Sequence, residues 1–257
     1  MKAIAKRFSA AAPTYDQSAT VQAQVACRLM EHIPSTLRPD RILEIGCGTG
    51  LLTASLRRMF PHSRLDALDL APAMIVEARK NIPDPSINWL AGDIQSLPTG
   101  TGYQLVASSS SLHWLRPLEA GLAAVRWQMA DGGRLACAIM LAGTLQELHQ
   151  LRRQILPHKP PAARLPDSGE LRHALAANGL QIERLHVEMI ETRHASAAAL
   201  LRKLHDQGVT AGPFSRNHAP LVRGELHRLT VAYDEMFAGA GGVTATYQVA
   251  YLLAVKT

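Results

Sequence analysis

From residue 41 to residue 140, short apolar stretches alternate with longer segments in which apolar residues recur at helical spacing. Short apolar stretches bounded by turn residues predict strands near 41–45, 64–69, 87–91, 103–108 and 133–139. Stretches with helical spacing of apolar residues lie between them and predict helices near 51–60, 72–81 and 117–129. Strands that alternate with helices favour a parallel sheet with helices on both faces.

The segments outside this region are predicted to be largely helical. A helix is expected over 20–32 with Ser18 or Thr20 as its N-cap, and Pro13 argues against a continuous helix before residue 14. Further helices are expected over 143–155, 168–179, 196–209 and 219–237. Strict alternation predicts strands over 182–192 and 242–256, the last of which completes the sheet.

The first strand leads directly into a glycine-rich turn with the sequence EIGCGTG, which begins at Glu44. Gly46, Gly48 and Gly50 accept positive φ angles and let the backbone approach a ligand closely. The helix that follows begins with free N–H groups. In the dinucleotide fingerprint G-x-G-x-x-G the third glycine comes one residue later. The observed form, E-x-G-x-G-x-G, resembles the cofactor loop of the class I S-adenosylmethionine-dependent methyltransferases.

Carboxylates follow the next two predicted strands. Asp69 ends LDALD, where its carboxylate can accept hydrogen bonds from ribose hydroxyls. Asp93 and Ile94 follow the third strand, where the class I superfamily holds the adenine. The alternatives are a helix-capping role for Asp69 and a packing role for the glycines. Neither alternative explains why an acid follows each of two successive strands.

The fourth strand runs into four serines, residues 108–111, and then into the motif Leu112-His113-Trp114. Ligands bind beyond the carboxyl ends of the strands in open α/β sheets, so His113 and Trp114 are candidate substrate contacts. The alternative for His113 is a hydrogen-bonded structural histidine, and the alternative for Trp114 is plain core packing. Tyr15 is a further candidate because no hydrophobic pattern requires it there. Local surface packing is the alternative for Tyr15.

Composition narrows the possible partners. The 257 residues are 47% hydrophobic and 19% charged, which is typical of a globular protein. A net charge of +6 points to acidic partners, but the basic residues are dispersed and no aromatic-rich RNA-binding signature accompanies them. We therefore expect a general basic surface and no nucleic-acid partner.

The cysteines and the apolar stretches of the chain indicate in which cellular compartment the protein is expected. Three widely spaced cysteines form no disulfide framework or zinc motif, and we expect no metal site. The start of the chain lacks a signal-peptide pattern. The longest apolar stretch, LACAIMLAG, is too short to cross a membrane. We therefore expect a cytoplasmic protein with no membrane partner.

Over essentially its whole length the chain resembles the malonyl-acyl-carrier-protein O-methyltransferases of biotin synthesis, within the class I superfamily. The segments that carry this resemblance are RFSAAAPTYDQSATVQ, LEIGCGTG, LDALDLAPAMI, AGDIQSLP, SSSSLHWL, GTLQELHQ and TATYQVAYLLAVK. The cofactor motifs are specific only to the superfamily. TYDQ, GTLQELHQ and the closing TYQV narrow the resemblance to the family. After the SLHW motif, where the family often carries aspartates, this chain has Glu119 as the only nearby acid.

The resemblance implies an α/β fold with a doubly wound, mostly parallel seven-stranded Rossmann-like sheet and an inserted helical substrate lobe. It implies a single class I methyltransferase domain over 1–257. Its expected parts are an N-terminal helical cover over 1–38, an S-adenosylmethionine-binding core over 39–140, a helical substrate lobe over 141–181 and 195–240, and a final strand over 241–257.

The resemblance also implies transfer of a methyl group to the free carboxylate of malonyl-acyl carrier protein or malonyl-CoA, an early step of biotin synthesis. The cofactor-binding residues expected are Glu44, Gly46, Gly48, Gly50, Asp69, Leu70, Asp93, Ile94 and Ser109. Tyr15 and His113 are the expected catalytic residues, with Trp114 and Arg152 as substrate-binding residues. Because a carboxylate has a pKa near ~4, it is already a nucleophile at neutral pH and needs no general base.

Three alternatives of other kinds stay open at this stage. The first is a methyltransferase for another small carboxylate, such as an aconitate-like acid. The second is a methyltransferase for a quinone-type small molecule. The third, suggested by the basic pI of about 9.5, is a non-enzymatic module that binds S-adenosylmethionine or nucleic acid.

Overall fold

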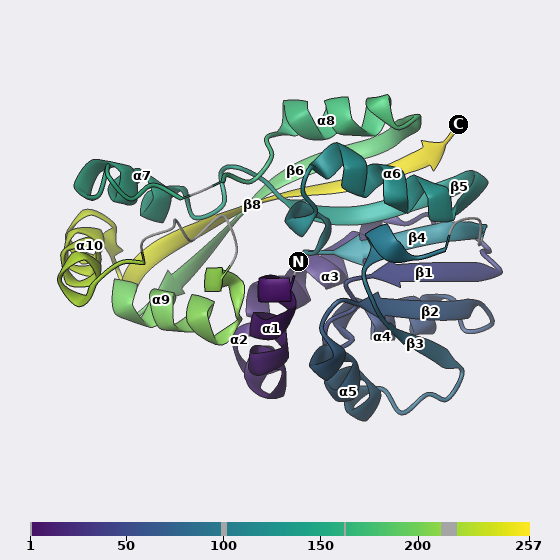
Figure 1. The fold of residues 1–257 in the computed structure, drawn as a ribbon, viewed down its shortest axis with the longest axis horizontal. Helices are drawn as coiled ribbons and strands as arrows, with labels where there is room; N and C mark the ends of the chain where they lie inside the picture. Colours follow the sequence, from purple (N-terminus) through teal and green to yellow (C-terminus); the bar gives the residue numbers. More distant parts are fainter. Residues whose placement is uncertain (1, 99–101, 162, 212–219) are drawn as a thin grey trace.

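The computed structural model describes residues 2–98, 102–161, 163–211 and 220–257, and one twisted sheet runs through these ranges (Figure 1). Its strand order is β3-β2-β1-β4-β5-β8-β6, and the short β7 pairs with β8. The strands are β1 (Arg41–Ile45), β2 (Arg64–Asp69), β3 (Ile87–Ala91), β4 (Tyr103–Ser109), β5 (Met129–Met140), β6 (Leu180–His194), β7 (Ala238–Gly239) and β8 (Gly242–Lys256). β1 to β5 pair in parallel, whereas β8 is antiparallel to both β5 and β6. The expected doubly wound, mostly parallel α/β fold is thereby confirmed.

Helices cover both faces of this sheet. The α-helices of the described ranges are α1 (Lys2–Ala11), α2 (Tyr15–Ser18), α3 (Thr20–His32), α4 (Leu51–Met59), α5 (Pro72–Asn81), α6 (Leu118–Gln128), α7 (Gln146–Ile155), α8 (Ser168–Ala177), α9 (Ala197–Asp206) and α10 (Arg223–Met236). Short 3-10 turns occur at η1 (Ala12–Thr14), η2 (Ile94–Ser96), η3 (Leu112–Trp114) and η4 (Val209–Ala211). One buried cluster joins α3 and α4 to the sheet, and a second joins α6 and α8 to the opposite face.

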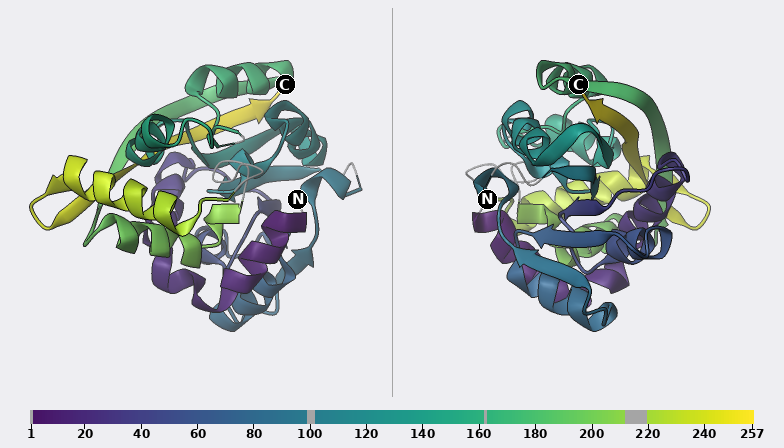
Figure 2. Two further views of the ribbon diagram at one scale, coloured as in Figure 1. Left: turned by 60° about the vertical axis from the view of Figure 1, so that its left-hand side comes forward. Right: turned by 90° about the vertical axis from the view of Figure 1, so that its right-hand side faces the viewer.

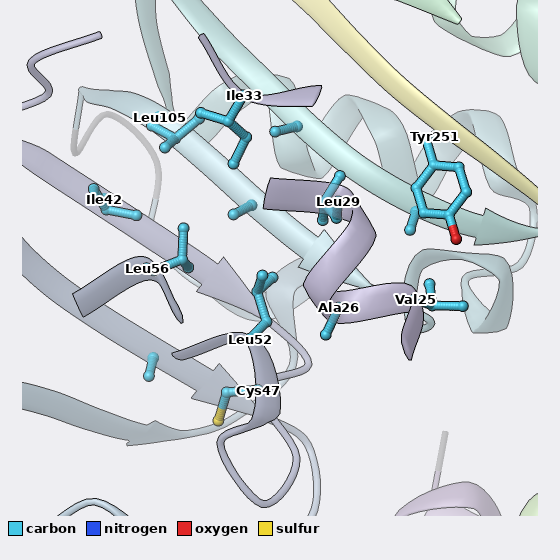
Figure 3. Close-up of a cluster of buried hydrophobic side chains, with 14 of the residues drawn as sticks. Val25, Ala26, Leu29, Ile33, Ile42, Cys47, Leu52, Leu56, Leu105 and Tyr251 are labelled. Carbon is cyan, nitrogen blue, oxygen red and sulfur yellow. The ribbon is translucent and has the colours of Figure 1, made fainter. Parts of the chain in front are cut away.

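The first of these clusters is shown in Figure 3. Leu29 of α3 and Leu56 of α4 are fully buried against Ile42 of β1 and Leu105 of β4. Burying an aliphatic side chain of this size contributes about 1.5–3 kcal/mol, which is why the apolar face of each helix seats on the sheet. The cluster fixes the strand ends from which the candidate site residues project.

The long strands β6 and β8 extend past the parallel part of the sheet and carry α7, α9 and α10, as Figure 1 shows. A separate buried cluster joins these helices, with Leu200 of α9, Leu229 and Tyr233 of α10, and Ala245 of β8 among its members. The Tyr233 hydroxyl donates a hydrogen bond to the carbonyl of Thr244 at 2.7 Å. We refer to α7, α9, η4 and α10 as the lobe. Residues 212–219, which the sequence prediction includes in this lobe, lie outside the described residues.

The N-terminal helix α1 lies between the core and the lobe and packs against both α5 and η4 (Figure 2). Gln207 at the end of α9 strengthens this connection, because its side-chain nitrogen donates to the carbonyl of Ser18 at 2.6 Å. The N-terminal segment therefore bridges the two parts of the molecule.

Some local expectations were wrong. The chain before residue 14 is helical, because Pro13 occupies the first turn of η1, a position that needs no donor N–H. The N-cap of α3 is Ala19, and the hydroxyl of Ser18 instead donates to the carbonyl of Tyr15. β5 begins at Met129, four residues before the strand predicted near 133–139, because Met129 already pairs with β4 and the register shifts at a bulge before Arg134.

No helix within the described ranges is long and apolar enough to cross a membrane. Nowhere in the same ranges do three or more His, Cys, Asp or Glu side chains lie where they could hold a metal ion.

Candidate active site

The glycine turn after β1 forms the floor of the candidate site. The three glycines have φ angles of 71°, 55° and 97° at Gly46, Gly48 and Gly50. A Cβ at Gly46 would lie 2.0 Å from the Ser111 hydroxyl oxygen, so only glycine fits there. A Cβ at Gly48 would meet nothing within 4 Å, so this part of the turn faces open space that a ligand can fill.

Asp69 at the end of β2 holds the turn in place. One carboxylate oxygen accepts a hydrogen bond from the Gly48 N–H at 2.8 Å, and the other accepts one from the Ala71 N–H at 2.8 Å. Burial raises the pKa of this carboxyl, although these backbone donors act in the opposite direction. A carboxylate offers about four lone-pair positions, so Asp69 keeps acceptor capacity toward the cavity beside it.

A cavity of about 120 Å³ opens above the turn, and we call it the acidic cavity. Three carboxylates, Glu44, Asp69 and Asp93, line it, and no Lys, Arg or His is among its described lining residues. Eight of the nine predicted cofactor-binding residues line it: Glu44, Gly46, Gly48, Asp69, Leu70, Asp93, Ile94 and Ser109. Gly50 is not a lining residue. It forms the N-cap of α4, where a Cβ would lie 2.7 Å from the side chain of Ile82.

Glu44 is the most unusual group of the acidic cavity. Its side chain is on β1 and the residue is only 1% exposed, and one of its carboxylate oxygens has no hydrogen-bond partner among the described residues. Burial raises the pKa of Glu44 to about 8, and the nearby charge of Asp69 acts in the same direction. The buried hydroxyl oxygen of Ser109 is also unpartnered within the described ranges. Leaving a buried polar group unpaired costs about 1–3 kcal/mol, so a ligand that supplies a cation and a hydrogen bond suits this cavity.

The N-terminal segment closes the acidic cavity from above. Asp16 of α2 accepts hydrogen bonds from the Thr49 hydroxyl at 2.5 Å and from the side-chain amide of Asn81 at 3.1 Å. The same amide donates to the Thr49 carbonyl at 3.0 Å. These three residues connect the N-terminal segment to the glycine turn and to α5. No sequence pattern singled out these three residues, although Asp16 lies within the TYDQ motif.

Aromatic side chains form the wall between this cavity and a larger neighbour. Phe8, Tyr15, Gln22, Ser110 and Trp114 line both cavities. The rings of Phe8 and Trp114 meet edge to face with centroids 5.7 Å apart, and Phe8 contacts Tyr15 in the same way at 6.4 Å. Burial, followed by the charges of Asp69 and Asp16, raises the pKa of Tyr15 well above its usual value. Its hydroxyl therefore stays protonated and can donate a hydrogen bond.

Ser110 has an unusual backbone in this wall. Its φ of 54° lies in the left-handed region, which costs a residue with a side chain about 1–3 kcal/mol. The Ser110 N–H donates to the Ala138 carbonyl at 2.9 Å, which helps to hold the strand exit in this conformation. The turn places Ser110 and His113 on the wall of the larger cavity.

The larger cavity has a volume of about 690 Å³, and we call it the basic cavity. Its described lining includes three arginines and four histidines but no Asp or Glu: Arg152, Arg202, Arg223, His113, His149, His205 and His227. The two cavities thus meet at the aromatic wall with opposite electrostatic character.

Two histidines of the basic cavity are held in the neutral form. His113 is 6% exposed, and burial, aided by the charge of Arg116, lowers its pKa to about 3. Burial and the charges of Arg153 and Arg152 lower the pKa of His149 to about 4. His113 and His149 therefore add no positive charge to the basic cavity at neutral pH, whereas its three arginines are charged. Neutral His113 can donate or accept a hydrogen bond without acting as a cation.

Arg152 lies on α7 and is 7% exposed. Its Nε donates to the Lys159 carbonyl at 2.9 Å, which fixes the guanidinium within the lobe. The structure therefore places Tyr15, His113, Trp114 and Arg152 on one cavity, although they come from three separate segments of the chain. Arg202 and Arg223 line the same cavity, and the sequence analysis missed them because surface arginines carry no pattern of their own.

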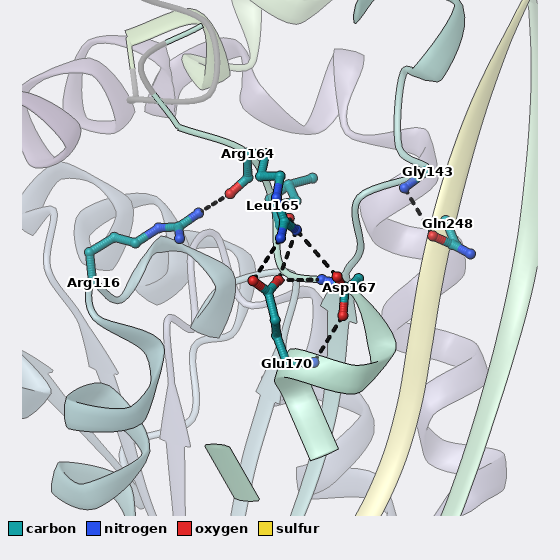
Figure 4. A network of polar contacts seen from close by, with 7 residues as sticks. All are labelled: Arg116, Gly143, Arg164, Leu165, Asp167, Glu170 and Gln248. Atoms are coloured by element: carbon teal, nitrogen blue, oxygen red, sulfur yellow. Dashed lines mark hydrogen bonds and ion pairs between the residues drawn. The ribbon is translucent and has the colours of Figure 1, made fainter. Parts of the chain in front are cut away.

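A polar network positions one side of the basic cavity (Figure 4). Arg164 forms two hydrogen bonds with the Glu170 carboxylate, at 2.7 and 2.8 Å, and Arg116 donates to the Arg164 carbonyl. Asp167 and Glu170 form a capping box at the start of α8. Together these contacts hold the loop that carries Leu165, a lining residue of the basic cavity, against the segment after η3.

Comparisons with known proteins show similarity to methyltransferases. A family model described as a methyltransferase domain matches residues 42–133. A malonyl-acyl-carrier-protein O-methyltransferase from Hahella chejuensis is 32% identical over 253 residues, which cover 96% of this chain and 87% of that protein. A biotin biosynthesis bifunctional protein from Bordetella avium is 35% identical over 97% of this chain, and this chain spans 51% of its length.

Solved structures share the fold at lower identity. A methyltransferase structure from Bacillus halodurans matches with a TM-score of 0.65 at 14% identity, covering 90% of this chain and 98% of that one. A geranyl diphosphate methyltransferase, solved in complex with S-adenosylmethionine, matches with a TM-score of 0.56 at 15% identity, covering 91% and 85% of the two chains.

Proposed function

The chain belongs to the malonyl-acyl-carrier-protein O-methyltransferase family, and on this premise we propose that it esterifies the free carboxylate of a malonyl thioester in biotin synthesis. It is an S-adenosylmethionine-dependent methyltransferase. The observation that carries the proposal is the opposite character of the two adjoining cavities. A cationic donor fits a cavity lined by carboxylates, and an anionic acceptor fits one lined by arginines.

The acidic cavity fits the cofactor. Glu44 would accept hydrogen bonds from the ammonium group of its methionine moiety, which would satisfy the unpartnered carboxylate oxygen. Asp69 would accept from ribose hydroxyls, and Gly48 leaves the space that a close approach requires. Asp93, Ile94 and Ser109 would surround the adenine end, and Leu70 would pack beside the ribose. When bound, S-adenosylmethionine supplies an electrophilic methyl group on a positively charged sulfur.

The acceptor side needs a positioned anion and no general base. A carboxylate with a pKa near ~4 is ionised at neutral pH. Tyr15 stays protonated and His113 stays neutral, so both can orient the carboxylate by hydrogen bonds without removing a proton. Arg152 supplies the positive charge that draws the anion into the cavity, and Trp114 packs beside it. Holding two reactants in line can contribute about 7–11 kcal/mol, the main effect expected here.

The aromatic wall also excludes water from the point where the two cavities meet. The ring of Phe8 contacts those of Tyr15 and Trp114 edge to face there. Water exclusion strengthens the attraction between the cationic donor and the anionic acceptor. The N-terminal segment contributes Phe8 and Tyr15 to this wall and is bound to the glycine turn through Asp16.

The test is incubation of the protein with methyl-labelled cofactor and a malonyl-carrier protein. We expect a labelled methyl ester that mild base removes, and no label on an acetyl-carrier protein, which has no free carboxylate. Malonyl-CoA in a parallel reaction measures the preference between the two carriers. Label that appears only with aconitate or with a quinone, and never with a malonyl thioester, would refute the proposal.

A further inference from the structure

The basic cavity is larger than the reacting acyl group. At about 690 Å³ it falls in the range of roughly 300–1,000 Å³ that holds drug-sized ligands. A malonyl group is a three-carbon diacid and fills a small part of it. The remaining space, lined largely by apolar side chains such as Leu148, Leu201 and Leu226, suits a longer arm attached to that acid.

Two arginines line this cavity from the surface of the lobe. Arg202 lies on α9 and Arg223 begins α10, and the two helices pack against each other. Both residues are exposed, unlike the buried Arg152. Neither Arg202 nor Arg223 forms an ion pair or side-chain hydrogen bond with any residue of the described ranges. Their charge is therefore available to a ligand.

Two lysines of this region, by contrast, are already engaged. Lys159 donates to the Glu225 carboxylate at 2.8 Å, and Lys203 donates to the Thr20 hydroxyl at 2.8 Å. Glu225 of α10 is thus ion-paired with Lys159, and the cavity has no acid among its described lining residues. The exposed edge of the basic cavity consequently presents two guanidinium groups, and no carboxylate accompanies them among the described lining residues.

We propose that Arg202 and Arg223 bind the phosphate group that joins a pantetheine arm to its carrier. This assignment rests on the proposed function, because acyl carrier proteins and coenzyme A both attach acyl groups through such an arm. A guanidinium matches the geometry of phosphate oxygens and can form two parallel hydrogen bonds with them. The cavity then holds one anion inside, at the reacting carboxylate, and a second at its exposed edge, with the apolar arm between them.

Binding of 4′-phosphopantetheine and of pantetheine, measured by calorimetry, tests the assignment without turnover. We expect the wild-type protein to bind the phosphorylated compound at least about tenfold more tightly. The double variant Arg202→Gln/Arg223→Gln should bind both compounds within about twofold of each other. The matched control Arg172→Gln/Arg228→Gln loses the same charge from exposed positions outside the cavity and should behave like wild type.

Kinetics then identify the source of the phosphate. For malonyl-CoA and for malonyl-carrier protein, we expect each arginine substitution to raise KM about tenfold, which corresponds to about 1.4 kcal/mol, with kcat unchanged. For malonyl-pantetheine, which lacks the phosphate, KM should not change. Unfolding temperatures of all variants should match wild type because both side chains are exposed.

Three results would overturn the assignment. Equal wild-type affinity for the two pantetheine compounds would show that no phosphate site exists. Equal loss for malonyl-pantetheine and malonyl-CoA in the double variant would show that the arginines act on another part of the arm. A defect confined to the carrier protein would show that they contact its surface instead. Arginine-dependent binding of phosphopantetheine by a protein that methylates no malonyl thioester would refute the proposed function alone.

Discussion

Glu44 should make cofactor binding depend on pH. Burial raises its pKa to about 8 in the free protein, so the carboxyl is mostly protonated at pH 7. A bound ammonium group stabilises the ionised form, so binding must release the proton. Each pH unit below 8 therefore adds about 1.36 kcal/mol to the cost of binding.

The size of the effect follows from that pKa. With a pKa of about 8 in the free protein and below 6 in the complex, affinity at pH 6 should be roughly fiftyfold weaker than at pH 8. At pH 7 binding should release nearly one proton. The free protein should show the opposite trend in stability. Because the folded-state pKa is raised above its usual value, the stability from Glu44 is fully present below about pH 4.5 and is lost as pH rises toward 8.

Calorimetric titration with S-adenosylhomocysteine, in buffers of different ionisation enthalpy, measures the released proton directly. Titration of the ligand alone gives the contribution of its own amino group, which is subtracted. Glu44→Gln should bind weakly, with an affinity that does not change between pH 6 and pH 8. Glu119→Gln, an exposed acid-to-amide change on α6, is the control. Wild-type affinity that stays constant over this range, with no proton released, would refute the reasoning.

Four further outcomes are expected. Asp69→Ala should weaken cofactor binding by more than about 1 kcal/mol in calorimetry, because it removes the acceptor that also holds the Gly48 N–H. His113→Ala should lower kcat while leaving S-adenosylhomocysteine affinity intact. In the wild type, kcat at saturating cofactor should be constant from about pH 6 to 8, because the pKa of His113 is about 3. Asp16→Ala should raise KM for the cofactor severalfold and increase hydrogen exchange in α1 and α2. Gly46→Ala should lower the free energy of unfolding by about 1–3 kcal/mol in denaturant titrations, because its φ is positive.

Each of these outcomes has a contrary result. Unchanged affinity in Asp69→Ala would remove that residue from the cofactor site. Equal loss of kcat and cofactor affinity in His113→Ala would indicate a purely structural histidine, and a rate that falls with a pKa near 6.5 would indicate a general base. Unaltered exchange in Asp16→Ala would mean that packing alone holds the N-terminal segment. Wild-type stability in Gly46→Ala would mean that Ser111 and the turn relax freely.

Local pattern determined much of the fold. The short apolar stretches of β1 to β4 and the helical spacing in the helices between them are properties of short segments, and the chain buries its apolar residues accordingly. The glycine spacing likewise determined where a ligand-binding turn would form, since positive φ is a property of the residue itself. The errors came where contacts with other segments determine the local structure. Residues 131–133 are an example, because pairing of β5 with β4 includes them in a bulged strand.

The tertiary structure alone decided how the site is assembled. Tyr15, the pair His113 and Trp114, and Arg152 are far apart in the sequence, and only the packing of α2, η3 and α7 in the folded chain brings them to one cavity. The same holds for the raised pKa of Glu44, because burial by distant segments, which no local pattern encodes, removes its carboxylate from water. The sequence by itself therefore determined the chemistry of the cofactor turn, whereas the separation of acidic and basic cavities, and the two arginines at the exposed edge, depended on contacts between remote residues.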